Sequence, residues 1–455
     1  MEWLNDPNPV DSPTVEKARQ LSQPWIDGTM SILAEARAVV DAGPVCDSCV
    51  GRVFADRSFG LSNADRGRSL RVAVALGDDE PYESVDPEEC WVCEGECGRF
   101  DEWADRAVDA IGDPEFGTYQ VGTKTPPLIE ENDELLRMDA GLDADRGELF
   151  KSNMNREVGK RIGQQTGAEV DFGRPDVQVT LDVEADRVET KLNSAFVYGR
   201  YRKLERDIPQ TEWPCRECHG SGRKGSRPCK HCDGEGYLYP ESVEQLSAPI
   251  VMDVMDGTEA TFHGAGREDV DALMVGTGRP FVIEIEEPHR RTVDTERLEG
   301  DINAFAEGKV EVEGLRLASY EMVERVKQLD ASKTYRAAVE FDADVTSDEL
   351  QAAIETLDGA TIEQYTPERV DHRRAGLTRV RDVLGASAEL EDARHATVEI
   401  HGEGGLYIKE LISGDDGRTE PSLAGLLATE AVVTALDVTA VEGVDELFER
   451  EEFFL

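Results

Sequence analysis

The sequence predicts an α+β protein whose N-terminal part binds zinc. Helix-like and strand-like patterns alternate from about residue 102, nine cysteines fall into spaced pairs, and short apolar strand patterns fill the C-terminal half. A chain of 455 residues is long enough for about two to four domains.

The N-terminal region begins with a helical pattern and continues into two CxxC pairs. Apolar residues recur at helical spacing over residues 14–41. The spacing of the pairs predicts one tetrahedral zinc site from Cys46, Cys49, Cys90 and Cys93. Cys97 is left as a free thiol or an alternative ligand, and a redox role for each pair is the competing interpretation.

The next region has strand patterns followed by a basic, aromatic segment. Residues 176–183 alternate apolar and polar side chains, as a half-buried strand does, and a return strand follows at 188–193. Residues 198–206 contain four bases with Tyr198 and Tyr201 among them. That composition is typical of a segment that contacts nucleic acid, although a solvated basic loop would look alike.

A second cysteine cluster repeats the pattern C-x-x-C-x-G-x-G. Its two halves predict a zinc knuckle, because glycines permit the tight turns that such a site needs. It resembles the zinc repeats of DnaJ-type chaperones, but without a J-domain signature it does not imply chaperone function. The predicted ligands are Cys215, Cys218, Cys229 and Cys232.

The C-terminal half mixes strand and helix patterns. Strand-like stretches occur at 249–255, 281–285, 338–341 and 396–400. Helices are predicted over 319–328 and 347–356.

Composition bounds the setting in which the protein works. The chain has 96 acidic and 49 basic residues, of which only 12 are lysines, and a formal net charge of -47. The acids are spread over the whole length, which is typical of proteins from concentrated salt, where screening over about 3 Å weakens repulsion between anions. No signal peptide or membrane span is evident, so we expect a cytoplasmic protein with thiolate–metal sites rather than disulfides.

The most informative polar segment is Gly266-Arg267-Glu268-Asp269-Val270-Asp271, between apolar stretches. A carboxylate held near a guanidinium stays ionised and can act as a nucleophile or base. Two further segments accompany it: Lys333-Thr334-Tyr335, and a stretch from Gly404 that reads G-G-L-Y-I-K and contains Tyr407 and Lys409. Strand alternation across the third segment would bury Leu406 and Ile408 and project Tyr407 and Lys409 together.

Together these segments resemble the active site of pseudouridine synthases, most closely the archaeal tRNA pseudouridine-54/55 synthase family (Pus-ten type). The resemblance implies that Asp269 is the catalytic nucleophile, with Asp271 as the competing assignment, and that Lys409 is its cationic partner. It also implies substrate binding by a set of tyrosines and arginines. These are Tyr335, Tyr407, Arg267, Arg373 and Arg374.

The resemblance further implies the architecture. Residues 1–100 would form an N-terminal helix and zinc-binding region, and residues 101–205 a THUMP-like RNA-binding domain. Residues 206–455 would form a pseudouridine synthase domain on a mixed, largely antiparallel sheet, with the zinc knuckle inserted at 213–237. The implied substrate is tRNA, at uridines 54 and 55 of the TΨC arm.

The same resemblance implies no cofactor for catalysis, structural Zn²⁺ at one or two sites, no membrane association and no obligate protein partner. The chemistry could begin with attack on C1′ or through a glycal. The alternative function is that of a non-catalytic zinc-containing RNA-binding protein.

Overall fold

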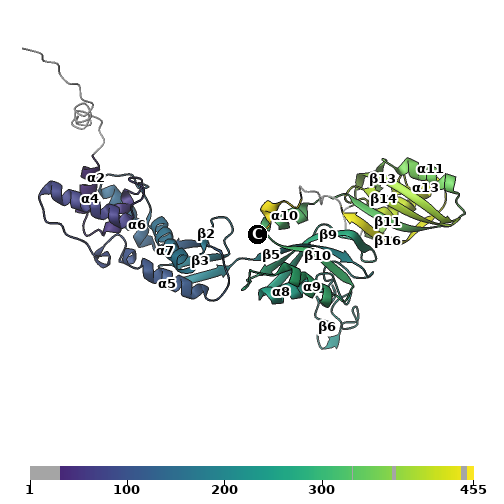
Figure 1. The fold of residues 1–455 in the computed structure, drawn as a ribbon, viewed down its shortest axis with the longest axis horizontal. Coiled ribbons are helices and arrows are strands. Elements are labelled where there is room, and N and C mark those ends of the chain that lie inside the picture. The colour runs from purple at the N-terminus through teal and green to yellow at the C-terminus, as the bar shows by residue number, and fades with distance from the viewer. Residues whose placement is uncertain (1–30, 330, 371–375, 442–447) are drawn as a thin grey trace, which may run out of the picture. The chain divides into compact units, whose positions relative to one another are not determined.

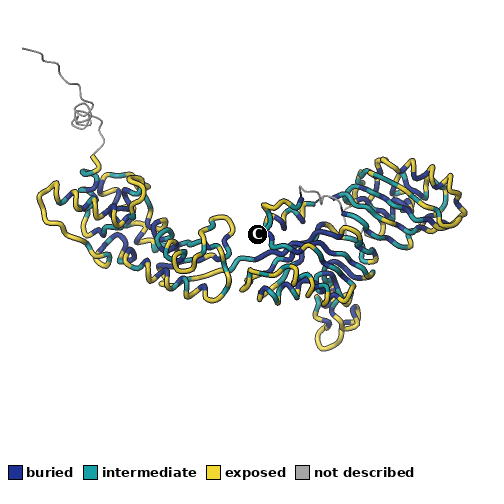
Figure 2. Tube along the Cα trace, in the orientation of Figure 1, coloured by how far each residue is buried: buried dark blue, intermediate teal, exposed yellow. Residues whose placement is uncertain are grey.

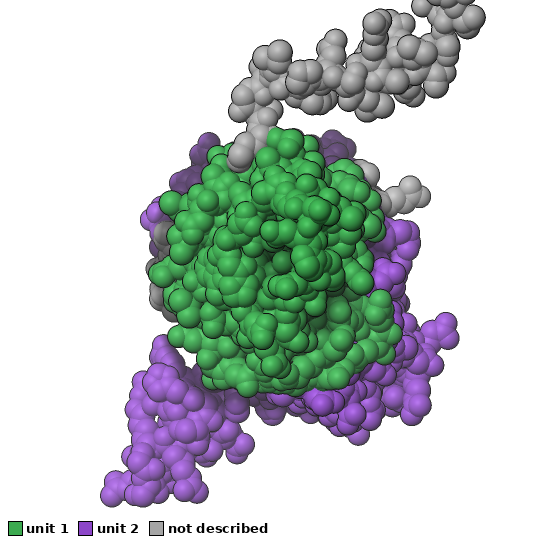
Figure 3. All heavy atoms as spheres, turned by 90° about the vertical axis from the view of Figure 1, so that its left-hand side faces the viewer, with its two compact units in different colours: residues 1–107, 121–165, 180–189 green, residues 108–120, 166–179, 190–455 purple. Residues whose placement is uncertain are grey.

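The computed structural model describes residues 31–329, 331–370, 376–441 and 448–455, which form an α+β protein. The chain divides into two compact units (Figure 3). One comprises residues 1–107, 121–165 and 180–189, and the other residues 108–120, 166–179 and 190–455. No helix in the described ranges is both long and apolar enough to cross a membrane.

The N-terminal half consists of helices and a four-stranded sheet of order β2-β1-β3-β4 (Figure 1). Of the predicted helix 14–41, the structure describes α2; the part before residue 31 lies outside the described residues. The predicted strand at 176–183 is β3 and the return strand is β4. The elements are α2 (Ile32–Asp41), α3 (Asp47–Val53), α4 (Asn63–Asp78), η1 (Pro87–Glu89), η2 (Glu96–Gly98), α5 (Phe100–Ile111), β1 (Thr118–Lys124), α6 (Pro127–Asp139), α7 (Phe150–Thr166), β2 (Glu169–Val170), β3 (Val177–Asp182) and β4 (Arg187–Leu192).

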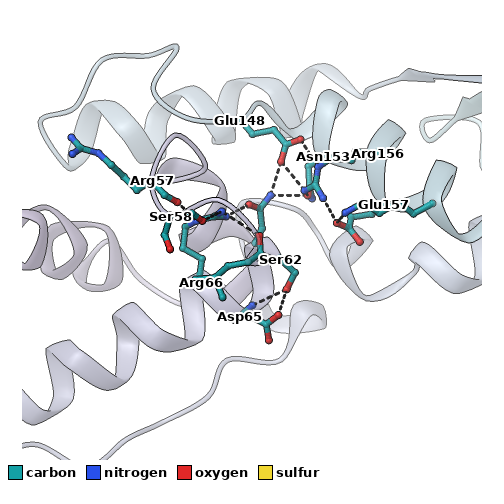
Figure 4. Close-up of polar contacts among 12 residues, drawn as sticks. Arg57, Ser58, Ser62, Asp65, Arg66, Glu148, Asn153, Arg156 and Glu157 are labelled. Carbon is teal, nitrogen blue, oxygen red and sulfur yellow. Dashed lines mark hydrogen bonds and ion pairs between the residues drawn. The ribbon is translucent and has the colours of Figure 1, made fainter. Parts of the chain in front are cut away.

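A polar network ties α4 to α7 within the first unit (Figure 4). The Asn63 amide donates to Glu148 at 2.6 Å and to Asn153 at 2.8 Å, while Arg66 donates to the Asn63 side chain at 2.6 Å. Arg156 donates to both oxygens of Glu148 at 2.9 Å. Because buried polar groups are costly unless paired, this network fixes the packing of the two helices.

The first cysteine group contains Cys97 in place of the predicted Cys90. The sulfurs of Cys46, Cys49, Cys93 and Cys97 all lie within 4.8 Å of one another. The chain turns sharply after Cys93 through Glu94 and Gly95, both with positive φ, which brings Cys97 back on η2. The turn makes a spacing of three residues suitable for a shared metal, so Cys97 joins the candidate ligands. Cys90 is also buried and interacts with Cys46 and Cys93, so the site predicted from the CxxC pairs stays a prediction.

The sulfur distances fit zinc at both clusters. Cys46–Cys93 and Cys49–Cys97 are separated by 3.8 Å, and Cys215–Cys229 and Cys218–Cys232 by 3.9 and 3.7 Å. Four thiolates about 2.3 Å from a tetrahedral Zn²⁺ would lie about 3.8 Å apart. Both sets of four are buried.

The Cys97 assignment makes a direct prediction. Cys97→Ser should remove one equivalent of zinc per chain and destabilise the first unit, because a structural metal contributes folding free energy. Cys90→Ser should keep both equivalents. Zinc content measured by mass spectrometry checks this. Loss of metal from the Cys90 variant and not from the Cys97 variant would support the site predicted from the CxxC pairs instead.

The C-terminal half is built on a ten-stranded sheet of order β10-β5-β9-β16-β11-β14-β13-β12-β15, with β8 paired to β9. Its neighbouring strands are antiparallel except β16 with β9, so the sheet is mixed and largely antiparallel. The strands are β5 (Ala195–Lys203), β8 (Glu259–Gly264), β9 (Leu273–Glu286), β10 (Val310–Ala318), β11 (Lys333–Phe341), β12 (Thr361–Tyr365), β13 (Thr378–Asp392), β14 (His395–Gly402), β15 (Thr419–Glu420) and β16 (Ala431–Val441).

Helices cover this sheet in three groups. Helices α8 (Ala248–Met255) and α9 (Thr295–Phe305) share one core with β5, β9 and β10. Helix α10 (Tyr320–Gln328) packs on Phe196, Tyr198 and Val282 in a second core. Helices α11 (Ser347–Leu357), α12 (Ile408–Ser413) and α13 (Leu423–Leu427) share a third core with β11 and β14. The short 3-10 turns are η3 (Glu368–Val370), η4 (Asp415–Gly417) and η5 (Glu451–Phe453).

Several predicted elements are confirmed and one is wrong in this half of the sheet. The helices at 319–328 and 347–356 are α10 and α11, and the strand at 281–285 lies within β9. The strand-like stretch 249–255 is instead helix α8, whose apolar residues pack on the sheet. Strand β5 pairs with β9 and β10, so residues 195–203 belong to the large sheet (dark blue strands in Figure 2).

Candidate active site

The Gly266–Asp271 segment is the loop between β8 and β9. It lies where β9 meets β16, whose parallel pairing joins Leu273 to Asp437 and Met274 to Val438. Gly276 makes this junction possible, because its φ is +63° and an added Cβ would lie 1.8 Å from the Thr439 carbonyl oxygen. The loop therefore sits at the centre of the sheet.

This loop forms one wall of a cavity of about 190 Å³. Its lining combines the three predicted segments, although they are far apart in the sequence. The lining includes Arg267, Glu268, Asp269, Arg279, Lys333, Tyr335, Arg369, Tyr407 and Lys409. The structure thus brings together every predicted catalytic and substrate-binding residue except Arg373 and Arg374, which lie outside the described residues.

Asp269 is held by two cations. Its Oδ1 is 3.2 Å from Arg369 Nη1, and its Oδ2 is 3.5 Å from Lys409 Nζ. The carboxylate is 35% exposed, so it is accessible from the cavity. Two cations on opposite oxygens orient the carboxylate and complement its charge, as a nucleophile needs.

Lys409 lies closer to the competing carboxylate than to Asp269. Its Nζ is 2.8 Å from Asp271. Burial raises the pKa of Asp271, but the hydrogen bond and the charge of Lys409, together with the charge of Arg369, lower it below its ordinary value. Asp271 is 60% exposed and does not line the cavity. The geometry therefore favours Asp269 for catalysis, with Asp271 as a brace for Lys409.

The sequence did not predict a role for Arg369, because only the basic cluster that follows it was recognisable as a pattern. Its Nε donates to Glu410 at 2.6 Å, and the Glu410 side chain is only 6% exposed. Burial alone would lower the pKa of Arg369, but Glu410 and Asp269 raise it above its ordinary value. No local pattern marks this pair, because its members are 41 residues apart.

Tyr335 lies on β11 and packs against two cores of the sheet. Burial raises the pKa of its phenol to about 12. At neutral pH the ring is therefore an uncharged wall of the cavity beside Asp269, suited to stacking on a base.

The Tyr335 pKa predicts the alkaline behaviour of the protein. An unfolded tyrosine ionises near pH 10, so stability from this group is present below about pH 10 and is lost as pH rises toward 12. Tyr335→Phe should therefore flatten the alkaline fall in the free energy of unfolding over that window. The pH dependence of activity between about pH 7 and 9 should keep the same shape as in the wild type. Denaturation at stepped pH and a pH–rate profile measure the two effects.

Tyr407 is fixed by its backbone rather than by a strand. Buried Gln364 accepts from the Tyr407 N–H and donates to its carbonyl, both at 2.9 Å. The predicted strand over this segment is wrong: α12 begins at Ile408. Leu406 and Ile408 are nevertheless buried, as the strand pattern predicted. Tyr407 and Lys409 line the cavity, because the turn into α12 also places alternate side chains on opposite sides of the chain.

A buried ionic network lies behind Asp269. The Glu268 carboxylate is 1% exposed, lies 3.0 Å from Arg279 Nε and accepts from the Tyr201 hydroxyl at 2.9 Å. Lys203, also fully buried, donates to the carbonyls of Val270 and Ile208 at 2.9 and 2.8 Å. Each ion has a partner, which holds the loop in one conformation.

The remaining predicted arginine, Arg267, faces away from this network. It is exposed, lies over the Trp213 ring at 5.3 Å from the centroid, and donates to the Thr211 hydroxyl at 3.3 Å. Arg291, in another basic stretch of the chain, lies 2.9 Å from Asp176 and so has a structural role.

Comparison with known proteins agrees with this geometry. The family described as "Pus10, C-terminal" matches residues 196–442, and "Pus10 THUMP domain, archaeal" matches residues 103–182. Together with the mixed sheet and the Asp269 cavity, these matches define an RNA pseudouridine synthase that carries a THUMP domain.

Two relatives are similar over almost their full length. The "tRNA pseudouridine synthase Pus10" of Halorubrum lacusprofundi is 71% identical over 93% of this chain and 100% of the relative. The protein of the same name from Methanothrix thermoacetophila is 42% identical over 91% and 95%. The chain belongs to the Pus10 family. The halophilic composition fits the Halorubrum relative.

Proposed function

We propose that this chain converts uridines 54 and 55 in the TΨC arm of tRNA to pseudouridine in the cytoplasm. The single observation that carries the proposal is Asp269, held between Arg369 and Lys409 in a cavity walled by Tyr335 and Tyr407. The relatives in the same family bear the name tRNA pseudouridine synthase.

In the proposed reaction the target uridine first leaves the base stack and enters the cavity. Asp269 then attacks C1′ of the ribose as the N1–C1′ bond breaks, or alternatively removes a ribose proton to form a glycal. The freed uracil rotates between Tyr335 and Tyr407. Its C5 then forms the new bond to C1′ as the Asp269–C1′ ester bond breaks or, by the glycal route, as Asp269 returns the ribose proton. Loss of the C5 proton and protonation of N1 complete an isomerisation with no net redox change.

Other residues would place the RNA. Arg267, Arg373 and Arg374 are proposed contacts to the tRNA, since guanidinium groups bind phosphates bidentately. In the proposed domain organisation residues 1–100 are a zinc-bearing region, 101–205 the RNA-binding domain and 206–455 the catalytic domain, except that β5 (Ala195–Lys203) belongs to the sheet of the catalytic domain. Zinc at both cysteine clusters would be structural, since no cluster cysteine lines the Asp269 cavity.

A tritium-release assay tests the proposal. Transcripts of tRNA labelled as [5-³H]uridine are incubated with the protein in concentrated KCl, and the modified positions are then mapped. Release of tritium with pseudouridine at positions 54 and 55 is expected. Release that maps elsewhere in the tRNA would overturn the site assignment, and no release with tRNA bound would overturn the activity.

A further inference from the structure

The second cysteine cluster holds a hairpin that the proposed reaction does not use. This zinc hairpin, residues 213–239, contains only the two-residue strands β6 (Arg223–Lys224) and β7 (Arg227–Pro228). Its hydrophobic interior consists of the four cysteines, and most of its other residues are exposed (Figure 2). A metal-held loop of this kind presents side chains rigidly without a hydrophobic core.

The zinc hairpin has more basic than acidic side chains, unlike the chain as a whole. Residues 213–239 contain five lysines and arginines and three carboxylates, in a chain of net charge -47. Lys224 pairs with Glu217. Within the described ranges, no carboxylate oxygen lies within 4.0 Å of the other four bases, which are Arg216, Arg223, Arg227 and Lys230.

Several exposed arginines elsewhere have carboxylate partners, such as Arg336 with Glu399 at 2.8 Å and Arg394 with Asp344 at 2.9 Å. In the described ranges others, such as Arg68 and Arg290, have no carboxylate oxygen within 4.0 Å, so the zinc hairpin differs by having four such bases close together. With about twice as many acids as bases, a random surface base would acquire a carboxylate neighbour. A cluster that has none is suited to an external polyanion.

The base of the zinc hairpin is attached to the catalytic loop. Trp213 packs edge-on against Tyr239, with centroids 5.3 Å apart, and it also contacts the guanidinium of Arg267. Just before the hairpin, Gln210 donates to the carbonyl of Gly266 at 3.0 Å. A polyanion bound along the hairpin is therefore held beside the loop that carries Asp269.

We infer that the zinc hairpin is a second RNA-binding surface, whose four free bases contact phosphates of the same tRNA that enters the Asp269 cavity. This inference rests on the proposed function. Long-range attraction is screened in concentrated salt, so the contacts must be direct hydrogen-bonded pairs, for which arginine is suited. Three of the four bases are arginines.

The test replaces the four free bases by glutamine in the full-length, zinc-loaded protein. Its matched control, Arg316→Gln, Arg336→Gln, Arg394→Gln and Arg450→Gln, removes the same charge from bases that have carboxylate partners. The tRNA affinity is measured by fluorescence anisotropy between about 1 and 3 M KCl. The hairpin variant should bind at least about fivefold more weakly, and its salt slope should fall by about 0.7–0.9 for each phosphate that it no longer binds. The control should shift the affinity less than about twofold.

Each outcome has a definite meaning. Equal affinity of the hairpin variant and the wild type, or an equal loss in the control, overturns the inference while tritium release by the wild type still supports the proposed function. If the hairpin variant binds tRNA more weakly but the wild type releases no tritium, the proposed function is overturned. The inference that the zinc hairpin binds RNA is then still supported. If the fourfold variant loses zinc, the double variant Arg223→Gln/Arg227→Gln, on β6 and β7 away from the knuckles, decides between the same outcomes.

Discussion

Replacement of Asp269 by asparagine is expected to lower the rate of uridine isomerisation by at least about 10³-fold while tRNA affinity stays within about twofold. The amide keeps the volume of the carboxylate but has no negative charge to attack C1′ or accept a proton. Single-turnover tritium release and tRNA anisotropy measure the two quantities.

Asp271→Asn is the matched control for this experiment. Asp271 braces Lys409 but does not line the cavity, so its replacement should slow the reaction only about two- to tenfold. A larger fall in rate for the Asp271 variant than for the Asp269 variant would move the nucleophile to Asp271.

Glu268→Gln is expected to have the largest effect on stability. It leaves the buried guanidinium of Arg279 without its carboxylate, and breaking a buried ion pair costs about 3–5 kcal/mol. The thermal midpoint should fall by about 2–4 °C for each kcal/mol in a domain of this size. Differential scanning calorimetry in concentrated KCl measures the change.

Glu399→Gln is the control, because Glu399 pairs with Arg336 on the surface and such pairs contribute about 1 kcal/mol or less. A Glu268 variant as stable as this control would show that the buried pair does not hold the catalytic loop.

The sequence predicted the residues that line the cavity better than the residues that support them. Asp269, Tyr335, Tyr407 and Lys409 stand in segments with recognisable spacing, and the structure gathers them around one cavity. Arg369–Glu410 and Glu268–Arg279 were missed because a pair formed across the fold leaves no local pattern. Gln364 was missed for the same reason, since its partner is the backbone of Tyr407.

Two errors in secondary structure have a common physical origin. Residues 249–255 and 406–412 are short apolar runs, for which periodicity alone does not separate a buried helix from a strand. In both, burial was the reliable part of the prediction: Val251 and Met255 pack in the core from α8, and Leu406 and Ile408 pack in the core at the start of α12.

The parallel pairing of β9 with β16 has a consequence for how activity is lost. It joins two parts of the sheet whose cores meet there, since Val438 and Val441 of β16 pack in the same core as Met274 of β9, and its register spans only two residue pairs. Asp269 lies on one side of this junction, and Arg369, Tyr407 and Lys409 lie on the other. Local opening there would separate Asp269 from its cations while most of each core stayed folded. Mild heating should therefore inactivate the enzyme, reversibly, below the temperature at which its secondary structure melts.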